Sequence, residues 1–255
     1  MSDSSFDLSG KVAIVTGASR GLGRAIATAY AHRGAQVVIA SRKLDACVEA
    51  AEEITSQTGR KAMAIACHVG HWDDCGALVD RALEAFGRVD VLVNNAGSSP
   101  LYPSLTAVSE EYFDKLIAVN LKGAFRLCAL VGDHMAKAEG GSIINISSIS
   151  AVAPGPMELP YAAAKAALNA MTLGLARAYA PKVRANVIMP GRFMTDVAKH
   201  WSADTLQAID AAVPLGRAGQ PDEIVGAALY LASAASSYTT GALLTVDGGR
   251  SITTT

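Results

Sequence analysis

The stretch Val12-Ala-Ile-Val-Thr-Gly-Ala-Ser-Arg-Gly-Leu-Gly23 decides the fold of this chain of 255 residues. It begins with an apolar, β-branched run that predicts a strand, continues with three glycines, and leads into a helical pattern over 22–33. Glycines there permit a tight turn and let backbone N–H groups approach a pyrophosphate at the helix N-terminus. The spacing G-x-x-x-G-x-G differs from G-x-G-x-x-G and lacks the ending of a nucleotide triphosphate loop. It favours dinucleotide binding, with a purely structural turn as the alternative.

The same order of a short apolar strand and a helix recurs along the chain. Strands that alternate with helices predict parallel βαβ units with right-handed crossovers and helices on both faces of the sheet. No internal repeat or low-complexity linker interrupts this pattern, so we predict a single domain over residues 1–255. The predicted strands cover 12–16, 36–40, 62–69, 89–94, 142–147, 184–189 and 243–246. The predicted helices cover 22–33, 43–57, 72–86, 110–137, 161–180 and 221–231.

Composition excludes several classes of protein. Apolar residues make up 51% of the chain and charged residues 18%, which is typical of a core-rich globular protein. The 22 basic and 23 acidic residues include no basic tract, so we expect neither nucleic acid nor an anionic membrane surface as a partner. No apolar stretch reaches the roughly 18 residues of a spanning helix, and Met1–Gly10 does not resemble a secretory signal. We therefore expect a cytoplasmic protein.

The segment 67–75 contains two cysteines and two histidines, which are residue types that bind metals. However, Cys67 and His68 are neighbours on a predicted strand, and neighbours on a strand point to opposite faces. The four cysteines of the chain form no C-x-x-C pair, as expected of reduced thiols. We predict no metal site.

Polar and small residues gather at the carboxyl ends of the predicted strands, where ligands of such sheets bind. Asn94-Asn95-Ala96-Gly97 ends the fourth strand, either beside a cofactor or as an ordinary Asn-rich turn. Asn120 interrupts a helical pattern in which Asn is a mediocre helix former, so either a local role or chance explains it. Ser147-Ser148 follows the fifth strand, where a lone serine is otherwise a cap or turn residue.

The end of the second strand bears on which dinucleotide binds. An acidic residue there would accept hydrogen bonds from the ribose hydroxyls of NAD. This chain has Ser41-Arg42 instead, and Arg20 stands inside the glycine loop. Guanidinium groups and a hydroxyl suit a 2′-phosphate, so the pattern favours NADP(H) over NAD(H). The alternative is that both arginines are solvated surface charges.

Tyr161 and Lys165 are four residues apart on a predicted helix and therefore share a face. A nearby ammonium favours phenolate, so we expect Lys165 to lower the pKa of Tyr161 from its usual value of about 10. Such a group is suited to give a proton to a carbonyl oxygen, or to take one from an alcohol. A Tyr and a Lys one turn apart also occur by chance. The order of glycine loop, Asn-rich turn, serine and Tyr-x-x-x-Lys makes coincidence a poor explanation.

These motifs, in this order, resemble those of the classical short-chain dehydrogenase/reductase family. The resemblance runs from Lys11–Gly17 to Val246–Gly249 and includes Val119-Asn120, Pro190-Gly191 and Thr195. It implies a single Rossmann-type domain, a doubly wound parallel sheet of about seven strands, and assembly as a homotetramer. It also implies a small-molecule carbonyl or alcohol substrate.

The resemblance assigns roles to individual residues. Tyr161 would be the acid/base, Ser148 would hold the carbonyl oxygen, and Lys165 would bind the nicotinamide ribose and depress the pKa of Tyr161. Asn120 would hold a water in a proton relay. Ser148 is preferred to Ser147 because its spacing of thirteen residues to Tyr161 matches the family better.

The remaining implied contacts are with the cofactor. Pro190, Gly191 and Thr195 would seat the nicotinamide carboxamide, and Asn94 would flank the adenosine half. The full predicted cofactor set is Gly17, Ser19, Arg20, Gly21, Leu22, Gly23, Ser41, Arg42, Val69, Asn94, Ala96, Gly97, Tyr161, Lys165, Pro190, Gly191, Phe193 and Thr195.

Two residues depart from the family pattern or stand outside it. The third strand of the family ends in an Asp that contacts adenine, but here the position reads His68-Val69, so a side-chain contact by His68 is not expected. Arg192 follows Pro190-Gly191 and would meet a substrate carboxylate or phosphate, or else face solvent.

The sequence thus predicts an NADP(H)-dependent oxidoreductase that interconverts an alcohol and a ketone or aldehyde. The alternatives are a 3-oxoacyl-thioester reductase of fatty acid synthesis and a non-catalytic nucleotide-binding sensor. The predicted pocket walls, at 98–103, 149–160 and 192–213, are fairly apolar and include Trp201. We predict that 192–213 forms a substrate lid, as loops beside such sites often do.

Overall fold

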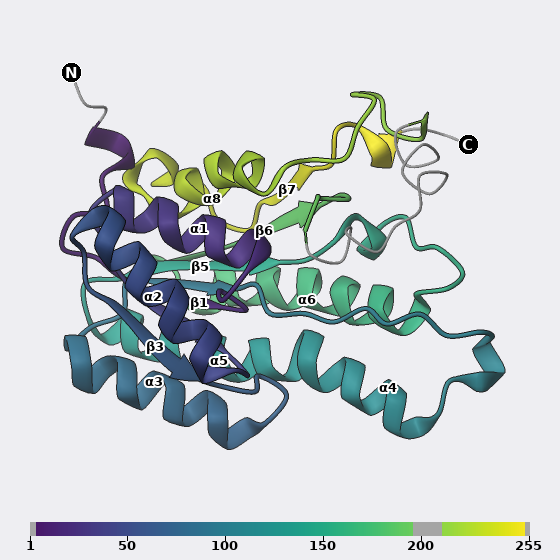
Figure 1. The fold of residues 1–255 in the computed structure, drawn as a ribbon, viewed down its shortest axis with the longest axis horizontal. Helices are drawn as coiled ribbons and strands as arrows, with labels where there is room; N and C mark the ends of the chain where they lie inside the picture. Colours follow the sequence, from purple (N-terminus) through teal and green to yellow (C-terminus); the bar gives the residue numbers. More distant parts are fainter. Residues whose placement is uncertain (1–3, 196–210, 253–255) are drawn as a thin grey trace.

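The computed structural model describes residues 4–195 and 211–252. One parallel sheet has the strand order β3-β2-β1-β4-β5-β6-β7 (Figure 1). The predicted doubly wound sheet is therefore confirmed. Its strands are β1 (Val12–Thr16), β2 (Gln36–Ser41), β3 (Ala62–Ala66), β4 (Val91–Asn94), β5 (Gly141–Ile146), β6 (Val183–Pro190) and β7 (Leu243–Val246). The helices are α1 (Gly21–His32), α2 (Leu44–Thr58), α3 (Trp72–Phe86), α4 (Glu110–Ile117), α5 (Gly123–Lys137), α6 (Leu159–Ala178) and α8 (Val225–Ala232).

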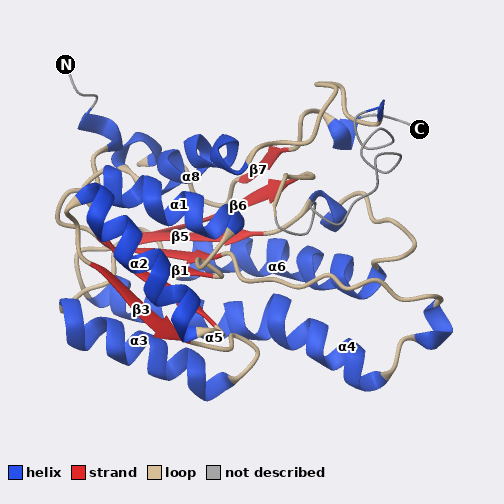
Figure 2. Ribbon diagram, in the orientation of Figure 1, coloured by secondary structure: helices blue, strands red, loops and turns tan. Residues whose placement is uncertain are grey.

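Helices cover both faces of the sheet (Figure 2). Successive residues of a strand point to opposite faces, so each buried strand supplies two cores. Ala13 and Val15 of β1 pack in a cluster with α1, α2 and α8, whereas Ile14 packs in a second cluster with α3, α5 and α6. Every residue of β1 is buried, which explains why its sequence is a continuous apolar run rather than an alternating one.

The long helix predicted over 110–137 is interrupted. It divides into α4, a π-helical turn over Ala118–Lys122 (η3), and α5. Asn120 lies in the π turn, and its Nδ2 donates to the Leu116 carbonyl at 3.0 Å. A π turn shifts the backbone hydrogen bonds by one residue, and the Asn side chain satisfies a carbonyl of the preceding turn. Asn120, a poor helix former, thus lies where the helix departs from regular α-helical geometry.

Other predicted boundaries move by a few residues. The third strand ends at Ala66 rather than 69, since the chain turns there and the His71 N–H donates to the His68 carbonyl at 2.8 Å. The helix predicted over 221–231 begins as a 3₁₀ turn over Pro221–Ile224 (η6) before α8. The predicted lid over 192–213 falls largely on residues 196–210, which lie outside the described residues, as does Trp201.

Within residues 4–195 and 211–252, no helix is long and apolar enough to cross a membrane.

Glycine 23 is required by close packing. A Cβ there would lie 2.4 Å from Asn95 Nδ2 and 2.6 Å from the Gly17 carbonyl oxygen, whereas a Cβ at Gly174 in α6 would meet nothing within 4 Å. We expect Gly23→Ala to lower the free energy of unfolding by about 1–3 kcal/mol, because the glycine loop must shift. Gly174→Ala, the matched control, should raise it by about 0.5–1 kcal/mol through helix propensity. Urea unfolding measures both, and a Gly23→Ala protein as stable as the parent would contradict this packing.

Candidate active site

The predicted reactive residues come together beyond the carboxyl end of β5. Ser148 follows that strand, Tyr161 and Lys165 lie on α6, and Asn120 lies in the π turn η3. Lys165 Nζ is 5.7 Å from the centroid of the Tyr161 ring, and Ser148 hydrogen-bonds Tyr161. A Cβ on Gly97 would lie 3.1 Å from Asn120 Oδ1 and 3.6 Å from Lys165 Nζ. Elements far apart in sequence thus meet in one site.

Lys165 is buried, with a relative exposure of 3%. Its Nζ donates to the Ile146 carbonyl at 2.8 Å, and within the described part of the chain it forms no ion pair. Burial of an ammonium disfavours its charged form, and it lowers the pKa of Lys165 to about 8. The amine is therefore close to its own titration point near neutral pH.

The expected lowering of the Tyr161 pKa is not found. Burial raises the pKa of Tyr161 above its ordinary value, the hydrogen bond from Ser148 opposes that rise, and the charge of Glu158 adds to it. The prediction assumed that the ammonium of Lys165 would dominate, but desolvation of the phenolate is the larger effect here. Without further positive charge, Tyr161 is a phenol at neutral pH.

The two adjacent serines have different partners. Ser147 Oγ donates to the Lys165 carbonyl at 3.2 Å, so its hydroxyl fastens α6 to the end of β5. Ser148 instead caps a 3₁₀ turn over Ile149–Ala151 (η4) and hydrogen-bonds Tyr161. Of the two hydroxyls, that of Ser148 faces the phenol.

Asn120 uses both ends of its amide. Its Nδ2 donates to the Ser98 carbonyl at 2.9 Å, and its Oδ1 accepts from the Ser98 N–H at 3.1 Å. The side chain is 1% exposed and ties the loop after β4 to the π turn. Since Gly97 adjoins both Asn120 and Lys165, this tie defines one wall of the site.

The glycine loop between β1 and α1 has the conformation that its sequence predicts. Gly17 and Gly21 have φ of 65° and 57°, in the left-handed region that favours glycine. Asn95 Nδ2 donates to the Thr16 carbonyl at 2.9 Å and to the Gly17 carbonyl at 3.2 Å, which holds the loop against the end of β4. The N-terminus of α1 carries unpaired N–H groups by geometry, as a pyrophosphate site requires.

Of the cofactor residues predicted after β6, Thr195 lies next to this loop. A Cβ on Gly21 would lie 3.5 Å from Thr195 Cγ2. A Cβ on Gly191 would meet Asp247 Cβ at 2.7 Å, so only glycine fits there, and the buried Phe193 packs on Gly219. Glycine at positions 191 and 219 thus lets the neighbouring segments pack closely against this part of the chain. These residues fit a dinucleotide.

At the end of β2, Ser41 lies within 3.1 Å of Cys47 Sγ and Arg42 is exposed. Burial lowers the pKa of His68, with smaller contributions from the charges of His71 and Arg42. The His68 Nδ1 accepts from the Gly70 N–H at 3.2 Å, and its ring stacks on His71 at 4.2 Å. The exposed Arg42 thus stands at the end of β2, where NAD-binding folds place an acid.

The other predicted residues occupy the same edge of the sheet. Val69 is buried, and its carbonyl oxygen would lie 1.9 Å from a Cβ on Gly123, so the start of α5 packs directly on it. The Ala96 N–H donates to Thr16 Oγ1 at 3.1 Å. Ser19, Arg20 and Leu22 flank the glycines, Pro190 ends β6, and Arg192 is exposed.

Two residues next to the site, Asn145 and Asn95, were not singled out from the sequence as site residues. Asn94 Nδ2 donates to Asn145 Oδ1 at 2.8 Å, and Asn145 Nδ2 donates to Thr172 Oγ1 of α6 at 2.8 Å. This buried chain braces β4 and β5 against α6 directly below the site. The signal in the sequence was an amide inside the apolar run of β5, since a buried polar group needs a partner. The second neighbour, Asn95, was quoted only as part of a motif.

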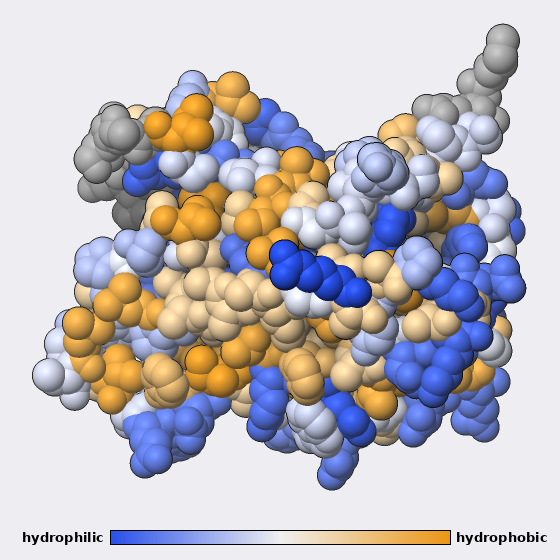
Figure 3. Space-filling model, turned by 180° about the vertical axis from the view of Figure 1, so that it is seen from behind, coloured by the Kyte–Doolittle hydropathy of each residue, from blue (hydrophilic) through white to orange (hydrophobic). Residues whose placement is uncertain are grey.

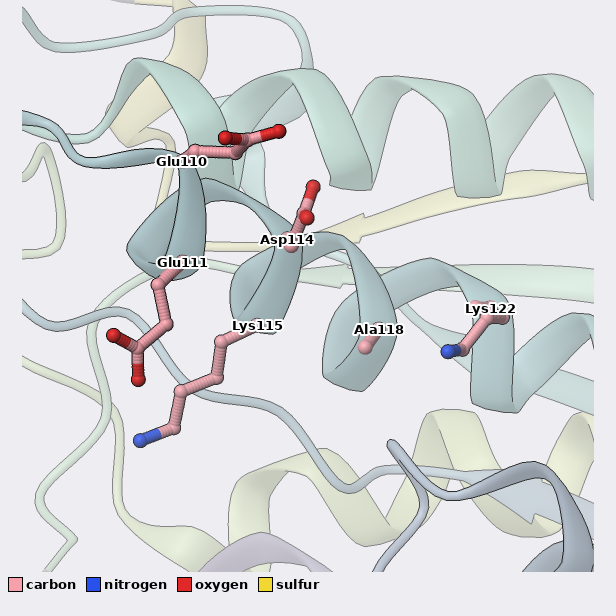
Figure 4. Close-up of a pocket in the computed structure, with 6 residues that line it drawn as sticks. All are labelled: Glu110, Glu111, Asp114, Lys115, Ala118 and Lys122. Atoms are coloured by element: carbon pink, nitrogen blue, oxygen red, sulfur yellow. The ribbon is translucent and has the colours of Figure 1, made fainter.

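A separate depression of about 540 Å³ lies on α4 and η3 (Figure 4). Three carboxylates and two lysines line it on these helical segments, and none of the predicted reactive groups reaches it. Its lining residues are Glu110, Glu111, Asp114, Lys115, Ala118 and Lys122.

Comparison with known proteins identifies the family. The profile of a family described as enoyl-(acyl carrier protein) reductase matches residues 17–251. A 3-oxoacyl-[acyl-carrier-protein] reductase of Chlamydia muridarum is 41% identical over 240 residues, which cover 94% of this chain and 96% of that protein.

Solved structures agree with the sequence comparison. A short-chain type dehydrogenase/reductase from Mycobacterium marinum superposes with a TM-score of 0.91 at 37% identity, covering 97% of this chain and 98% of that one. The NADPH-dependent 3-quinuclidinone reductase from Rhodotorula rubra has a TM-score of 0.92 at 31% identity, covering 98% and 94%.

The buried amine of Lys165 predicts a pH-dependent stability. Its pKa in the folded chain is about 8, below the ordinary 10.5, so the unfolded chain binds more protons between these values. Stability lost by burying the charge is therefore greatest below pH 8 and returns as the pH rises. We expect Lys165→Met to raise the free energy of unfolding at pH 7 by about 1–3 kcal/mol.

Denaturation at pH 7 and at about pH 10 measures this effect, with Lys115→Met as a control on the surface of α4. The advantage of Lys165→Met should shrink at the higher pH. A constant difference across that range would show that the amine is not desolvated.

Proposed function

Because this chain belongs to the short-chain dehydrogenase/reductase family, we propose that it interconverts an alcohol and a ketone or aldehyde with NADP(H) as cofactor. The observation that carries the proposal is the meeting of Ser148, Tyr161 and Lys165 at the strand ends, beside the glycine loop. The bound nicotinamide would supply or accept the hydride at this place. The chain's own groups would handle the proton.

In the direction of reduction, Tyr161 would give its phenolic proton to the carbonyl oxygen. Its pKa is raised by burial, so the phenol is protonated at neutral pH, as a donor must be. Ser148 would hold the same oxygen with its hydroxyl. Lys165, whose pKa is about 8, would hydrogen-bond the nicotinamide ribose and add positive charge near the phenol. Asn120 would position a water next to Lys165.

The glycine loop and the N-terminus of α1 would hold the pyrophosphate. Pro190, Gly191 and Thr195 would seat the carboxamide of the nicotinamide, and of these Thr195 lies beside Gly21 of that loop. The hydrogen bonds among Asn94, Asn145 and Thr172 would hold the ends of β4 and β5 in place next to this site.

The preference for NADP(H) rests on the end of β2. Ser41 and Arg42 stand there without a carboxylate, Arg42 is exposed, and Arg20 is exposed in the glycine loop. A guanidinium can form paired hydrogen bonds with a phosphate, whereas a carboxylate would repel it. The similar 3-quinuclidinone reductase is NADPH-dependent by its name.

Apolar side chains are exposed in two of the segments predicted to wall the pocket, 98–103 and 149–160, which favours a hydrophobic carbonyl compound as substrate. Leu101, Val152, Met157 and Leu159 are 74%, 58%, 41% and 38% exposed. The second candidate is a 3-oxoacyl thioester, favoured by the 41% identity to a 3-oxoacyl-[acyl-carrier-protein] reductase. A non-catalytic sensor would not need the assembled serine, tyrosine and lysine.

We also propose a homotetramer located in the cytoplasm. A broad band of hydrophobic residues crosses one side of the molecule (Figure 3). Large apolar side chains are exposed on three helices of the described chain: Phe113 of α4 is 44% exposed, Phe125 of α5 is 47% and Leu173 of α6 is 41%. Exposed apolar area of this kind is typical of a surface that another subunit covers. Light scattering in solution measures the assembly.

Replacement of Tyr161 tests the assigned acid/base. Tyr161→Phe keeps the ring and removes the proton, so kcat for reduction of a carbonyl panel with NADPH should fall at least about 1,000-fold. Binding of NADPH, followed by fluorescence, should change little. Tyr238→Phe is the control, because Tyr238 is fully exposed. Full activity of Tyr161→Phe would refute the proposed role.

Replacement of Arg42 tests the choice of cofactor. Arg42→Ala should raise the KM for NADPH by about 10–100-fold, the loss of a paired phosphate contact, and leave the KM for NADH nearly unchanged. The adjacent exposed Lys43→Ala is the matched control for charge. Equal kcat/KM for NADPH and NADH in the parent enzyme would contradict the preference itself.

A further inference from the structure

Glu158 occupies the position before α6 where a side chain normally caps the helix, yet it forms no cap. Its carboxylate turns back toward the segment after β5 instead. Oε1 accepts a hydrogen bond from Ser150 Oγ at 2.8 Å and another from the Gly155 N–H at 3.2 Å. Glu158 therefore belongs to the surroundings of Ser148 rather than to its own helix.

A chain of hydroxyl groups joins this carboxylate to the reactive tyrosine. Ser150 Oγ donates to Glu158, Ser148 Oγ donates to Ser150 Oγ at 3.1 Å, and Ser148 hydrogen-bonds Tyr161. The Ser150 N–H also donates to Ser148 Oγ at 3.1 Å. Ser148 and Ser150 are 9% and 7% exposed, so these bonds are shielded from water.

The carboxylate fixes the direction of the chain. An ionised carboxylate only accepts hydrogen bonds, so Ser150 must spend its single hydroxyl hydrogen on Glu158. The oxygen of Ser150 can then only accept, and the hydrogen it accepts is that of Ser148. The one hydroxyl hydrogen of Ser148 therefore has two competing acceptors: the bond that it donates to Ser150 weakens the bond that it donates to Tyr161, which lowers the pKa of Tyr161.

The position of Glu158 is built into the fold. Its N–H donates to the Gly155 carbonyl at 3.4 Å, which closes a turn ahead of α6. Tyr102, from the loop after β4, donates to the Pro156 carbonyl at 2.8 Å and accepts from the Leu159 N–H at 3.0 Å. This clamp holds the segment on both sides of Glu158, so the carboxylate has a defined place.

We propose that Glu158 is a positioning residue for the reaction: through Ser150 it orients the hydroxyl of Ser148, and so it holds Tyr161 in its protonated form. The inference rests on the proposed function of Tyr161 as the acid/base. It makes carbonyl reduction, which begins from the phenol, the direction that this site favours.

The charges around Tyr161 are consistent with this role. Glu158 contributes to the raised pKa of Tyr161, after burial and against the hydrogen bond from Ser148. Lys165 faces the ring from the same helix at 5.7 Å, and the uncharged amide of Asn120 lies beside Gly97, which also adjoins Lys165. Around Glu158, the titratable group on the neighbouring loop is Tyr102. Glu158 is thus the negative charge that opposes Lys165.

Glu158→Gln is the sharpest test because it keeps the shape of the side chain and removes its charge. Ser150 is then free to donate or accept, and the hydrogen of Ser148 becomes available to Tyr161. For alcohol oxidation, kcat/KM rises with pH as Tyr161 loses its proton. This rising limb of the pH profile should move to lower pH by about one unit in the variant. Glu84→Gln, exposed on α3, is the matched control and should leave the limb unmoved.

Ser150→Ala is the second variant. It keeps the carboxylate but removes the acceptor for the Ser148 hydrogen, so the limb should move in the same direction by a smaller amount. It carries the test if Glu158→Gln does not fold, as judged by thermal melting. A limb at the parent's pH in either folded variant would overturn the proposal, even if kcat falls, because a merely structural role lowers kcat without moving the limb.

Ionisation of Tyr161 can also be read without cofactor or substrate. The near-ultraviolet tyrosinate absorbance of each protein, minus that of its Tyr161→Phe counterpart, isolates this phenol. Its titration should occur at lower pH in Glu158→Gln than in the parent, and coincident curves would overturn the proposal. If the parent shows no turnover on any substrate, the proposed function fails, while this titration still tests the hydrogen-bond chain.

Discussion

The site depends on how a buried ammonium is held at the end of β5. Lys165 Nζ donates to the Ile146 carbonyl at 2.8 Å, while Ser147 Oγ donates to the carbonyl of Lys165 at 3.2 Å. These two bonds run in opposite directions between the strand end and α6, and together they fix the helix that carries Tyr161. The buried amide chain of Asn94 and Asn145 supports the same junction from below. The placement of Tyr161 and Lys165 relative to the end of β5 follows from this attachment.

The attachment has an energetic cost that the rest of the fold offsets. Removing an ammonium from water without a carboxylate partner is unfavourable, and the fall of the Lys165 pKa to about 8 expresses this. The buried strands β1 and β5 supply compensating apolar burial. Burying Lys165 thus lowers the stability of the fold but keeps an amine whose charge can change near neutral pH. Such perturbed groups are typical of functional sites.

Much of this arrangement could be predicted from the sequence because periodic patterns determine it. The apolar runs gave each strand to within a few residues, and parallel strands necessarily bring Gly17 and Ser148 to one edge. The π turn at Asn120 could not be predicted, since it depends on tertiary contacts with Ser98. The raised pKa of Tyr161 was missed because burial cannot be seen in spacing, and the turn of Glu158 toward Ser150 leaves no local signature.

The alternation of side chains on β1 separates the two halves of the site. Val15 packs in the layer of α1, whose first turn carries the glycine loop, whereas Ile14 packs in the layer of α3, α5 and α6, which carries Tyr161 and Lys165. Neighbouring positions on one short strand therefore pack in different layers of the fold, on opposite faces of the sheet. Substitutions a single residue apart on β1 would therefore disturb different layers, one beneath the glycine loop and the other beneath Tyr161 and Lys165.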